Sequence, residues 1–208
     1  MRENWVMRII AGSHKGHRLV APKGVDTRPT GDRVREAAFN LIGPVDGAAV
    51  LDLFAGSGAM GLEALSRGAE RVVFVESDRD AVRAIEANLD KLGLRAAVTR
   101  SDAVRALAQE AAAGRRYDLV LVDPPYRMLA DLMPRLQRQL AAVLAPDGLV
   151  VVESDARDEP LVEGLDLRTS RRYGSARLSL FEHASSRSSG GGGAGLRAAG
   201  AGAGEGRE

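Results

Sequence analysis

The sequence predicts an α/β protein with a doubly wound, mostly parallel β-sheet, and three observations support this prediction. Short apolar runs alternate with helical patterns five times along the chain, which is typical of parallel strands connected by helices. One of the runs leads into a glycine-rich turn, as in nucleotide-binding strand–turn–helix units. The last two extended stretches follow each other closely and predict an antiparallel hairpin at one edge of the sheet.

The composition limits the class of protein. With 208 residues the chain is long enough for one well-packed domain with small additions. It has no cysteine, which excludes disulfides, zinc–thiolate sites and a cysteine nucleophile. No apolar run approaches the roughly 18 residues of a membrane span, and the N-terminus does not resemble a signal peptide. We therefore expect a cytoplasmic protein without membrane attachment.

Residues 7–20 predict two short strands around a turn at Gly12 to Gly16. The region between Arg2 and Arg35 is basic, although the whole chain has a net charge of only +1. Its acids are Glu3, Asp26 and Asp32, and its basic residues are those at positions 2, 8, 15, 18, 23, 28, 33 and 35. The segment is either a solvated basic hairpin or an appendage that binds a polyanion.

Residues 30–42 predict a helix whose first turn can be capped by Thr30 or Asp32. Its predicted apolar face consists of Val34, Ala37, Ala38, Leu41 and Ile42. Arg28, Arg33 and Arg35 lie near the start of this helix, where the helix dipole disfavours cations. This placement indicates either acidic partners within the protein or an anionic ligand.

The strand and glycine turn at residues 50–61 form the centre of the predicted site. Gly56, Gly58 and Gly61 follow an apolar run and lead into a helical pattern. Glycines let the backbone approach a ligand, and a helix N-terminus offers unpaired N–H donors. The spacing also fits a dinucleotide site, but Asp52 near the end of the strand suits a ligand with an ammonium group, such as S-adenosylmethionine. A dinucleotide site and a merely structural turn are the alternatives.

Two further strand ends carry acids that can contact the same ligand. The second strand, residues 71–76, ends in Glu76, where a carboxylate can accept hydrogen bonds from ribose hydroxyls. A helix and a short third strand follow at residues 78–92 and 96–100. Asp102 comes next, and it either contacts an amino group of the ligand or caps a helix at residues 104–113.

Asp123-Pro124-Pro125-Tyr126 is the second motif with a chemical interpretation. It follows the fourth strand, residues 117–122, at the same sheet edge as the glycine turn. The prolines remove backbone donors and leave carbonyl groups without local partners. Asp123 and a carbonyl can then accept both hydrogens of a base amino group, while Tyr126 stacks on the ring. The alternative is a proline-rich strand end whose aspartate is a cap.

The remaining chain predicts a helix and three strands, at residues 129–144, 148–153, 165–173 and 176–182. From residue 184 onward it is rich in Gly, Ala and Ser and is expected to be disordered. We predict three parts: a basic β-hairpin extension at residues 1–29, a ligand-binding domain at residues 30–183, and a tail at residues 184–208.

Together these motifs resemble a known enzyme family. Asp52-Leu-Phe-Ala-Gly-Ser-Gly58 and Asp123-Pro-Pro-Tyr126 are similar to motifs of class I methyltransferases, which have a Rossmann-like sheet and methylate amino groups of nucleic acids. The segment Arg28-Pro-Thr-Gly-Asp-Arg-Val-Arg-Glu36 narrows the resemblance to the RsmD family, which methylates the 2-amino group of a guanine in 16S ribosomal RNA. The resemblance extends over residues 7–183.

The resemblance implies S-adenosylmethionine as the cofactor and no metal. Its binding residues would be Asp52, Phe54, Gly56, Ser57, Gly58, Glu76, Ser77, Asp102 and Ala103. The target guanine and the catalysis would depend on Asp123, Pro124, Pro125 and Tyr126. Because phosphate contacts supply much of the affinity for RNA, we expect such contacts among Lys15, Arg18, Arg28, Arg33 and Arg35.

The expected partner is 16S ribosomal RNA, within the small ribosomal subunit or its assembly intermediates, and we expect the protein to act as a monomer. Two other hypotheses stay open. A DNA adenine or cytosine methyltransferase shares both motifs, although the chain has no long insertion for target recognition. A non-catalytic RNA-binding module is the third hypothesis, and the intact Asp123-Pro-Pro-Tyr126 motif argues against it.

Overall fold

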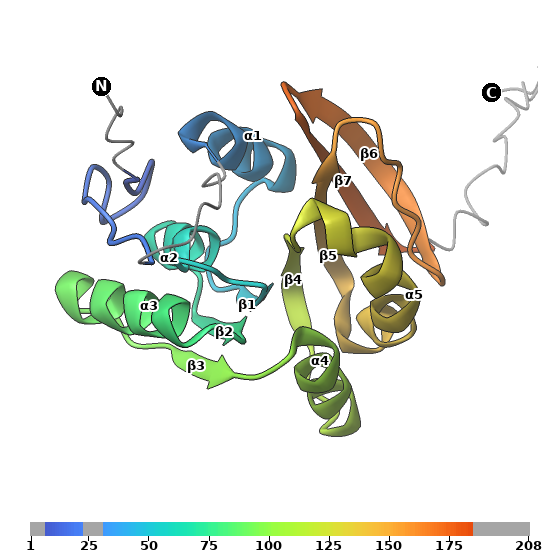
Figure 1. Cartoon of the computed structure of the whole chain (residues 1–208), viewed down its shortest axis with the longest axis horizontal. Helices are drawn as coiled ribbons and strands as arrows, with labels where there is room; N and C mark the ends of the chain where they lie inside the picture. Colours follow the sequence, from blue (N-terminus) through green and yellow to red (C-terminus); the bar gives the residue numbers. More distant parts are fainter. Residues whose placement is uncertain (1–6, 23–30, 185–208) are drawn as a thin grey trace, which may run out of the picture.

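A computed structural model describes residues 31–184 and residues 7–22, which we call the N-terminal segment. The chain forms one seven-stranded sheet with the strand order β3-β2-β1-β4-β5-β7-β6 (Figure 1). Strands β1 to β5 run parallel to one another, whereas β7 pairs antiparallel with both β5 and β6. The predicted α/β fold with a C-terminal antiparallel hairpin is therefore confirmed.

The elements follow the predicted order with small shifts of their ends. The strands are β1 (Ala49–Leu53), β2 (Arg71–Glu76), β3 (Ala97–Arg100), β4 (Tyr117–Val122), β5 (Leu144–Asp155), β6 (Leu165–Tyr173) and β7 (Ala176–His183). The helices are α1 (Asp32–Ile42), α2 (Ala59–Ser66), α3 (Arg79–Leu92), α4 (Ala103–Ala112) and α5 (Tyr126–Val143). Helix α5 begins three residues earlier than predicted, directly after Pro125, which is its N-cap residue.

Helices cover both faces of the sheet and form two hydrophobic cores (Figure 1). Helices α1, α2 and α3 pack on one face, where strand residues such as Val50 and Phe74 are buried. Helices α4 and α5 pack on the other face against residues such as Leu51 and Val75. Neighbouring residues of a strand point to opposite faces, so most residues of the central strands are buried and apolar. We call the face covered by α1, α2 and α3 the α2 face.

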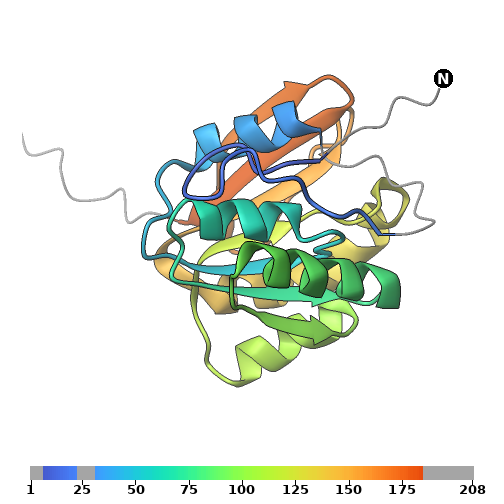
Figure 2. The same cartoon turned by 90° about the vertical axis from the view of Figure 1, so that its left-hand side faces the viewer.

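The N-terminal segment packs along α2 and α3 (Figure 2). Its two predicted strands are reduced to a single antiparallel bridge between Arg8 and Arg18, so this prediction was only partly right. The physical reason lies in the helices, because their side chains take up backbone groups that a longer hairpin would pair. The N–H groups of Ile10 and Ala11, for example, both donate to the carboxylate of Glu63 in α2.

Residues 1–6, 23–30 and 185–208 lie outside the described part of the chain. The predicted cap Thr30 and nearly all of the predicted disordered tail fall there. Helix α1 has Gly31 at its N-cap position without a side-chain cap, and Asp32 is its first residue rather than a cap. None of the described helices is long and apolar enough to cross a membrane.

Candidate active site

The glycine loop, residues 54–58, connects β1 to α2 at the carboxyl edge of the sheet. Gly56 and Gly58 have φ angles of 56° and 80°, in the left-handed region that glycine adopts most easily. Phe54 has a φ of 62°, which is an unusual conformation for a bulky side chain. Strain of this kind is typical of loops that are shaped for a ligand. Among the described residues other than its two chain neighbours, a Cβ built on Gly56 would meet only the Phe54 carbonyl oxygen, at 3.9 Å, so the loop is open there.

Gly61 has a different role from the other glycines of the motif. A Cβ at this position would lie 2.3 Å from the ring of Phe74 and 2.9 Å from Val72, so only glycine lets α2 pack this closely on β2. The close packing at Gly61 also brings its N–H to Asp52, whose Oδ2 accepts this N–H at 2.9 Å. The third glycine therefore serves helix–sheet packing and fixes the orientation of the Asp52 carboxyl group.

Asp52 is almost completely buried, with 3% of its surface exposed. Burial raises the pKa of its carboxyl group from 3.8 to about 7, although the hydrogen bond from Gly61 opposes this rise. The negative charges of Asp123 and Glu76 raise the pKa further. A nearby cation has the opposite effect and favours the ionised form. Asp52 is therefore a group whose charge depends on whether a cationic ligand is bound.

Glu76 connects the glycine loop to the end of β2. Its Oε2 accepts the N–H of Gly56 at 2.8 Å, and its Oε1 accepts those of Ser77 and Asp78 at 2.7 and 2.8 Å. Asp78 in turn caps α3 by accepting from Asp80 and Ala81. Glu76 is partly exposed, and its predicted contact with a ribose stays a prediction.

Four acids occupy equivalent positions on four neighbouring strands at the carboxyl edge. Each lies two residues after a buried side chain of the core on the α2 face. In the order of neighbouring strands they are Glu76, Asp52, Asp123 and Glu153. Side chains two residues apart along a strand share a face, so these four lie on the α2 face. We call them the acidic row. Their combined negative charge favours a cationic ligand beside the glycine loop.

The second predicted motif joins β4 to α5 at the same edge. Tyr126 is 37% exposed, and its hydroxyl donates to Oε1 of Glu153 in the neighbouring strand β5 at 3.1 Å. Partial burial and the Glu153 carboxylate both raise the pKa of Tyr126 above its usual range, so the phenol stays neutral. The exposed ring is thus held beside Asp123 and the exposed Pro125, which is an arrangement that can take up a flat base.

Asp102 adopts one of its two predicted roles. It is the N-cap of α4, and its side chain accepts the N–H of Arg105 at 3.1 Å. A contact with a ligand amino group stays a prediction, as does a cofactor contact of Ala103, which is buried as the first residue of α4.

The predicted RNA contacts do not all lie on the surface. Lys15, Arg18 and Arg33 are exposed, and Arg28 lies outside the described residues. Arg35 is fully buried, so the prediction that it contacts an RNA phosphate was wrong. Of the two explanations for the cations at the start of α1, acidic partners within the protein apply to Arg35.

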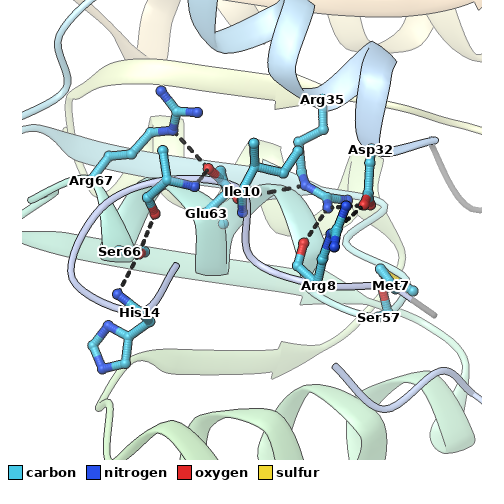
Figure 3. A network of polar contacts seen from close by, with 12 residues as sticks. Met7, Arg8, Ile10, His14, Asp32, Arg35, Ser57, Glu63, Ser66 and Arg67 are labelled. Atoms are coloured by element: carbon cyan, nitrogen blue, oxygen red, sulfur yellow. Dashed lines mark hydrogen bonds and ion pairs between the residues drawn. The ribbon is translucent and has the colours of Figure 1, made fainter. Parts of the chain in front are cut away.

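Arg35 belongs to a buried polar network between α1, α2 and the N-terminal segment (Figure 3). Its guanidinium lies 2.9 Å from Asp32 and 3.7 Å from Glu63, and it also donates to the carbonyl of Arg8. Glu63 has no exposed surface, and its Oε1 accepts from Arg67 at 2.8 Å in addition to its bonds to the N-terminal segment. The network joins three parts of the chain that are distant in sequence.

One end of the N-terminal segment lies at the glycine loop. The Asn88 side chain in α3 donates to the carbonyls of both Val20 and Ser57, at 3.0 and 3.1 Å. The turn that carries Lys15 lies at the other end of α2, where neighbouring residues bond to Ser66. Helix α2 has 8 residues and is therefore about 12 Å long. Lys15 thus lies near the end of α2 that is away from the glycine loop.

Three side chains that organise this site had no role in the sequence analysis, namely Glu63, Asn88 and Glu153. Glu153 carried a signal that could have been used, because it lies near the carboxyl end of its strand, as Asp52 and Glu76 do. Glu63 and Asn88 lie within helices and carried no comparable signal. Both bond to the backbone of the N-terminal segment, whose docking the sequence does not predict.

Comparisons with known proteins place this geometry in a family. A family model described as "Conserved hypothetical protein 95" matches residues 7–182. Ribosomal RNA small subunit methyltransferase D of Escherichia coli (strain K12) is 41% identical over 156 residues, which cover 73% of this chain and 76% of that protein. The chain belongs to the RsmD family.

Other relatives agree with membership of the RsmD family. The YlbH protein of Bacillus subtilis (strain 168), whose name marks it as a candidate rRNA methyltransferase, is 42% identical over 187 residues, covering 85% of this chain and 98% of that protein. A solved structure of the candidate methyltransferase yhhF from Escherichia coli superimposes with a TM-score of 0.74 at 38% identity, covering 85% of this chain and 97% of that chain. The resemblance of the sequence motifs to the RsmD family is therefore confirmed.

Proposed function

We propose that this member of the RsmD family transfers a methyl group from S-adenosylmethionine to the 2-amino group of a guanine in 16S ribosomal RNA. The observation that carries the proposal is that the glycine loop and the Asp123–Tyr126 motif meet at one sheet edge and share the acidic row. The Escherichia coli relative is named for methylation of small-subunit ribosomal RNA. The expected substrate is the small subunit or one of its assembly intermediates, and the monomeric state stays a prediction.

The residues present fit the proposed cofactor. When bound, S-adenosylmethionine supplies an electrophilic methyl group on a positively charged sulfonium. Asp52 matches the cofactor's positive charges, because burial disfavours its ionised carboxylate and a nearby cation stabilises it. Glu76 lies near enough to the open Gly56 backbone to bind a ribose beside it. These roles, like those of Phe54, Ser57, Gly58 and Ser77, are proposals from the geometry.

The Asp123–Tyr126 motif prepares the nucleophile. The lone pair of an exocyclic amino group is delocalised into the base, which makes the nitrogen a poor nucleophile. Hydrogen bonds from this amine to Asp123 and to the Pro124 carbonyl favour a pyramidal nitrogen with a localised lone pair. Tyr126 stacks on the base and holds it in line with the methyl group, so that most of the rate gain comes from orientation. Asp123 is placed to accept the proton that the methylated nitrogen releases.

A methyl-transfer assay with labelled cofactor tests the proposed function. Deproteinised 16S RNA, small subunits and duplex DNA, all from a strain lacking this gene, serve as substrates, and the labelled nucleotide is mapped. We expect 2-methylguanine in RNA or subunits. Labelled DNA would support a DNA methyltransferase, and cofactor binding without any transfer would support a non-catalytic module. Gly58→Asp is the inactive control, because a Cβ there lies 3.1 Å from Ile85 in a left-handed backbone.

Replacing Lys15 and Arg18 with alanine should weaken binding of RNA and make it less dependent on salt. Both residues are exposed, and each lost phosphate contact should lower the log–log salt slope by about one unit. Binding titrations at several salt concentrations measure this slope. The matched control is Arg135→Ala/Arg138→Ala on the exposed side of α5, which should leave the slope unchanged. An unchanged slope with a lowered melting temperature in the Lys15/Arg18 variant would mean that the segment is only structural.

Affinity for the cofactor should rise with pH and level off above about pH 7. Below the raised pKa of about 7, Asp52 is protonated in the ligand-free protein. A cationic ligand binds the ionised form, so each pH unit below this value should weaken binding by up to about tenfold. Calorimetric titration between about pH 5.5 and pH 7.5 measures the slope. In Asp52→Asn the slope should vanish, and a retained slope would assign the titration to another group.

A further inference from the structure

Glu153 lies beside the proposed base site and takes no part in the proposed transfer step. It is in β5, and only 8% of its surface is exposed. Its Oε1 already accepts the hydroxyl of Tyr126, the residue that stacks on the base. An ionised carboxylate can accept about four hydrogen bonds, so this bond is compatible with a second one to the base itself.

The register of the sheet brings Glu153 next to Asp123. Val122 of β4 pairs with Val152 of β5, and Asp123 and Glu153 are the residues that follow this pair. Neighbouring strands lie about 4.8 Å apart, so two side chains at paired positions can converge on adjacent atoms of one base. Both side chains belong to the acidic row on the α2 face. A base with its amino group on Asp123 can therefore present the adjoining ring atom to Glu153.

Two neighbouring carboxylates distinguish guanine from the other bases that carry an amino group. In guanine the 2-amino group adjoins N1–H, so the edge offers two adjacent donors. In adenine and cytosine the ring nitrogen beside the amino group carries a lone pair, which a carboxylate repels. Recognition of this kind rejects a ligand that presents a lone pair where the site expects a donor. Asp123 alone can bind the amino group of any of these bases, whereas Asp123 and Glu153 together bind the two adjacent donors of guanine.

We propose that Glu153 is a specificity-determining residue that accepts the N1–H of the target guanine while Asp123 accepts its 2-amino group. This inference rests on the proposed function and adds to it the residue that selects guanine. It also gives a reason why the nearly buried Glu153 of β5 lies beside the acid that follows β4. The bond to Tyr126 then aligns the stacking ring and the specificity group with each other.

Base analogues at the mapped nucleotide of a synthetic RNA test the inference. 2-Aminopurine keeps the 2-amino group but has a lone pair at N1, and inosine keeps N1–H but lacks the amino group. We expect the wild-type protein to prefer guanine over 2-aminopurine by about ten- to a hundredfold in kcat/KM. In Glu153→Gln this ratio should fall to within about threefold of unity, because an amide can donate to the lone pair. An unchanged ratio in Glu153→Gln would overturn the inference.

Three controls separate this inference from the proposed function. Inosine RNA should not be labelled, and labelling would contradict methylation of the 2-amino group itself. Equal rates for guanine and 2-aminopurine with the wild-type protein would contradict the role of Glu153 but not the proposed function. Glu163→Gln, at an exposed position, should keep the wild-type ratio. Tyr126→Phe should lower kcat/KM for both bases and keep the ratio, and a collapse equal to that of Glu153→Gln would show that Glu153 acts only by holding Tyr126.

Discussion

Replacing Asp123 with alanine should lower the rate of methyl transfer by about two to four orders of magnitude while cofactor binding is retained. The carboxylate is the proposed acceptor for the target amine, and removal of a group that acts on the reacting nitrogen affects the chemical step most. The negative charge of Asp123 attracts a cation, but it also raises the pKa of Asp52. Its removal therefore has two opposing effects on the binding of a cationic cofactor, and the affinity should change by no more than about threefold. Single-turnover transfer and calorimetric titration of the same sample measure the two effects separately.

The matched control for this variant is Asp131→Ala, an exposed aspartate of α5. It removes the same group and should transfer methyl groups at the wild-type rate. If Asp123→Ala also turned over at the wild-type rate, the assignment of the Asp123–Tyr126 motif to the target base would be wrong. If Asp123→Ala lost cofactor binding together with activity, its role would lie in the cofactor site instead.

Glu63→Ala should lower the free energy of unfolding by about 3–5 kcal/mol, a typical cost of removing one partner of a buried ion pair. Arg35 would keep a fully buried charge, and the N–H groups of Ile10 and Ala11 would lose their acceptor. Urea unfolding followed by circular dichroism measures this loss. Glu86→Ala, at an exposed site of α3, is the control and should change stability by less than about 0.5 kcal/mol.

A double variant separates the contribution of the ion pair to stability from that of the hydrogen bonds that dock the N-terminal segment. Replacing a buried ion pair with apolar residues is often neutral, so Arg35→Met/Glu63→Leu removes the buried charge of Arg35 together with that of Glu63. The N–H groups of Ile10 and Ala11 would still lack their acceptor. We therefore expect the double variant to recover only part of the stability, and full recovery would mean that these backbone bonds contribute little.

The strand–glycine–helix unit and the Asp123–Tyr126 motif could be predicted because both depend on residues that are adjacent in the sequence. The apolar runs of β1 and β4 are buried on both faces, which gives a continuous pattern. Gly58 and Gly61 are required by a left-handed backbone angle and by a close helix–strand contact. The elements that these signals define occur in the structure with small shifts at their ends.

The burial of Arg35 could not be predicted from the sequence. A cluster of arginines near a helix start is compatible both with an RNA surface and with internal pairing, and the spacing of charges does not distinguish the two. Arg35 lies on the same face of α1 as the buried residues Ala38 and Phe39, which are three and four positions farther along. Its acidic partner Glu63 is in another helix, so only packing of α1 against α2 decides that this arginine is internal.

The sequence by itself determined the fold class, the order of the elements and the two motifs at the carboxyl edge, since these follow from periodicity and from local backbone requirements. The tertiary structure decided which charged side chains are buried and which of them meet. Glu153 lies beside Tyr126 only because β4 and β5 pair in a particular register. Asn88 joins the glycine loop to the N-terminal segment only because that segment docks on α3. The physical reason is that such contacts join residues far apart in the chain, and local sequence patterns do not specify these pairs.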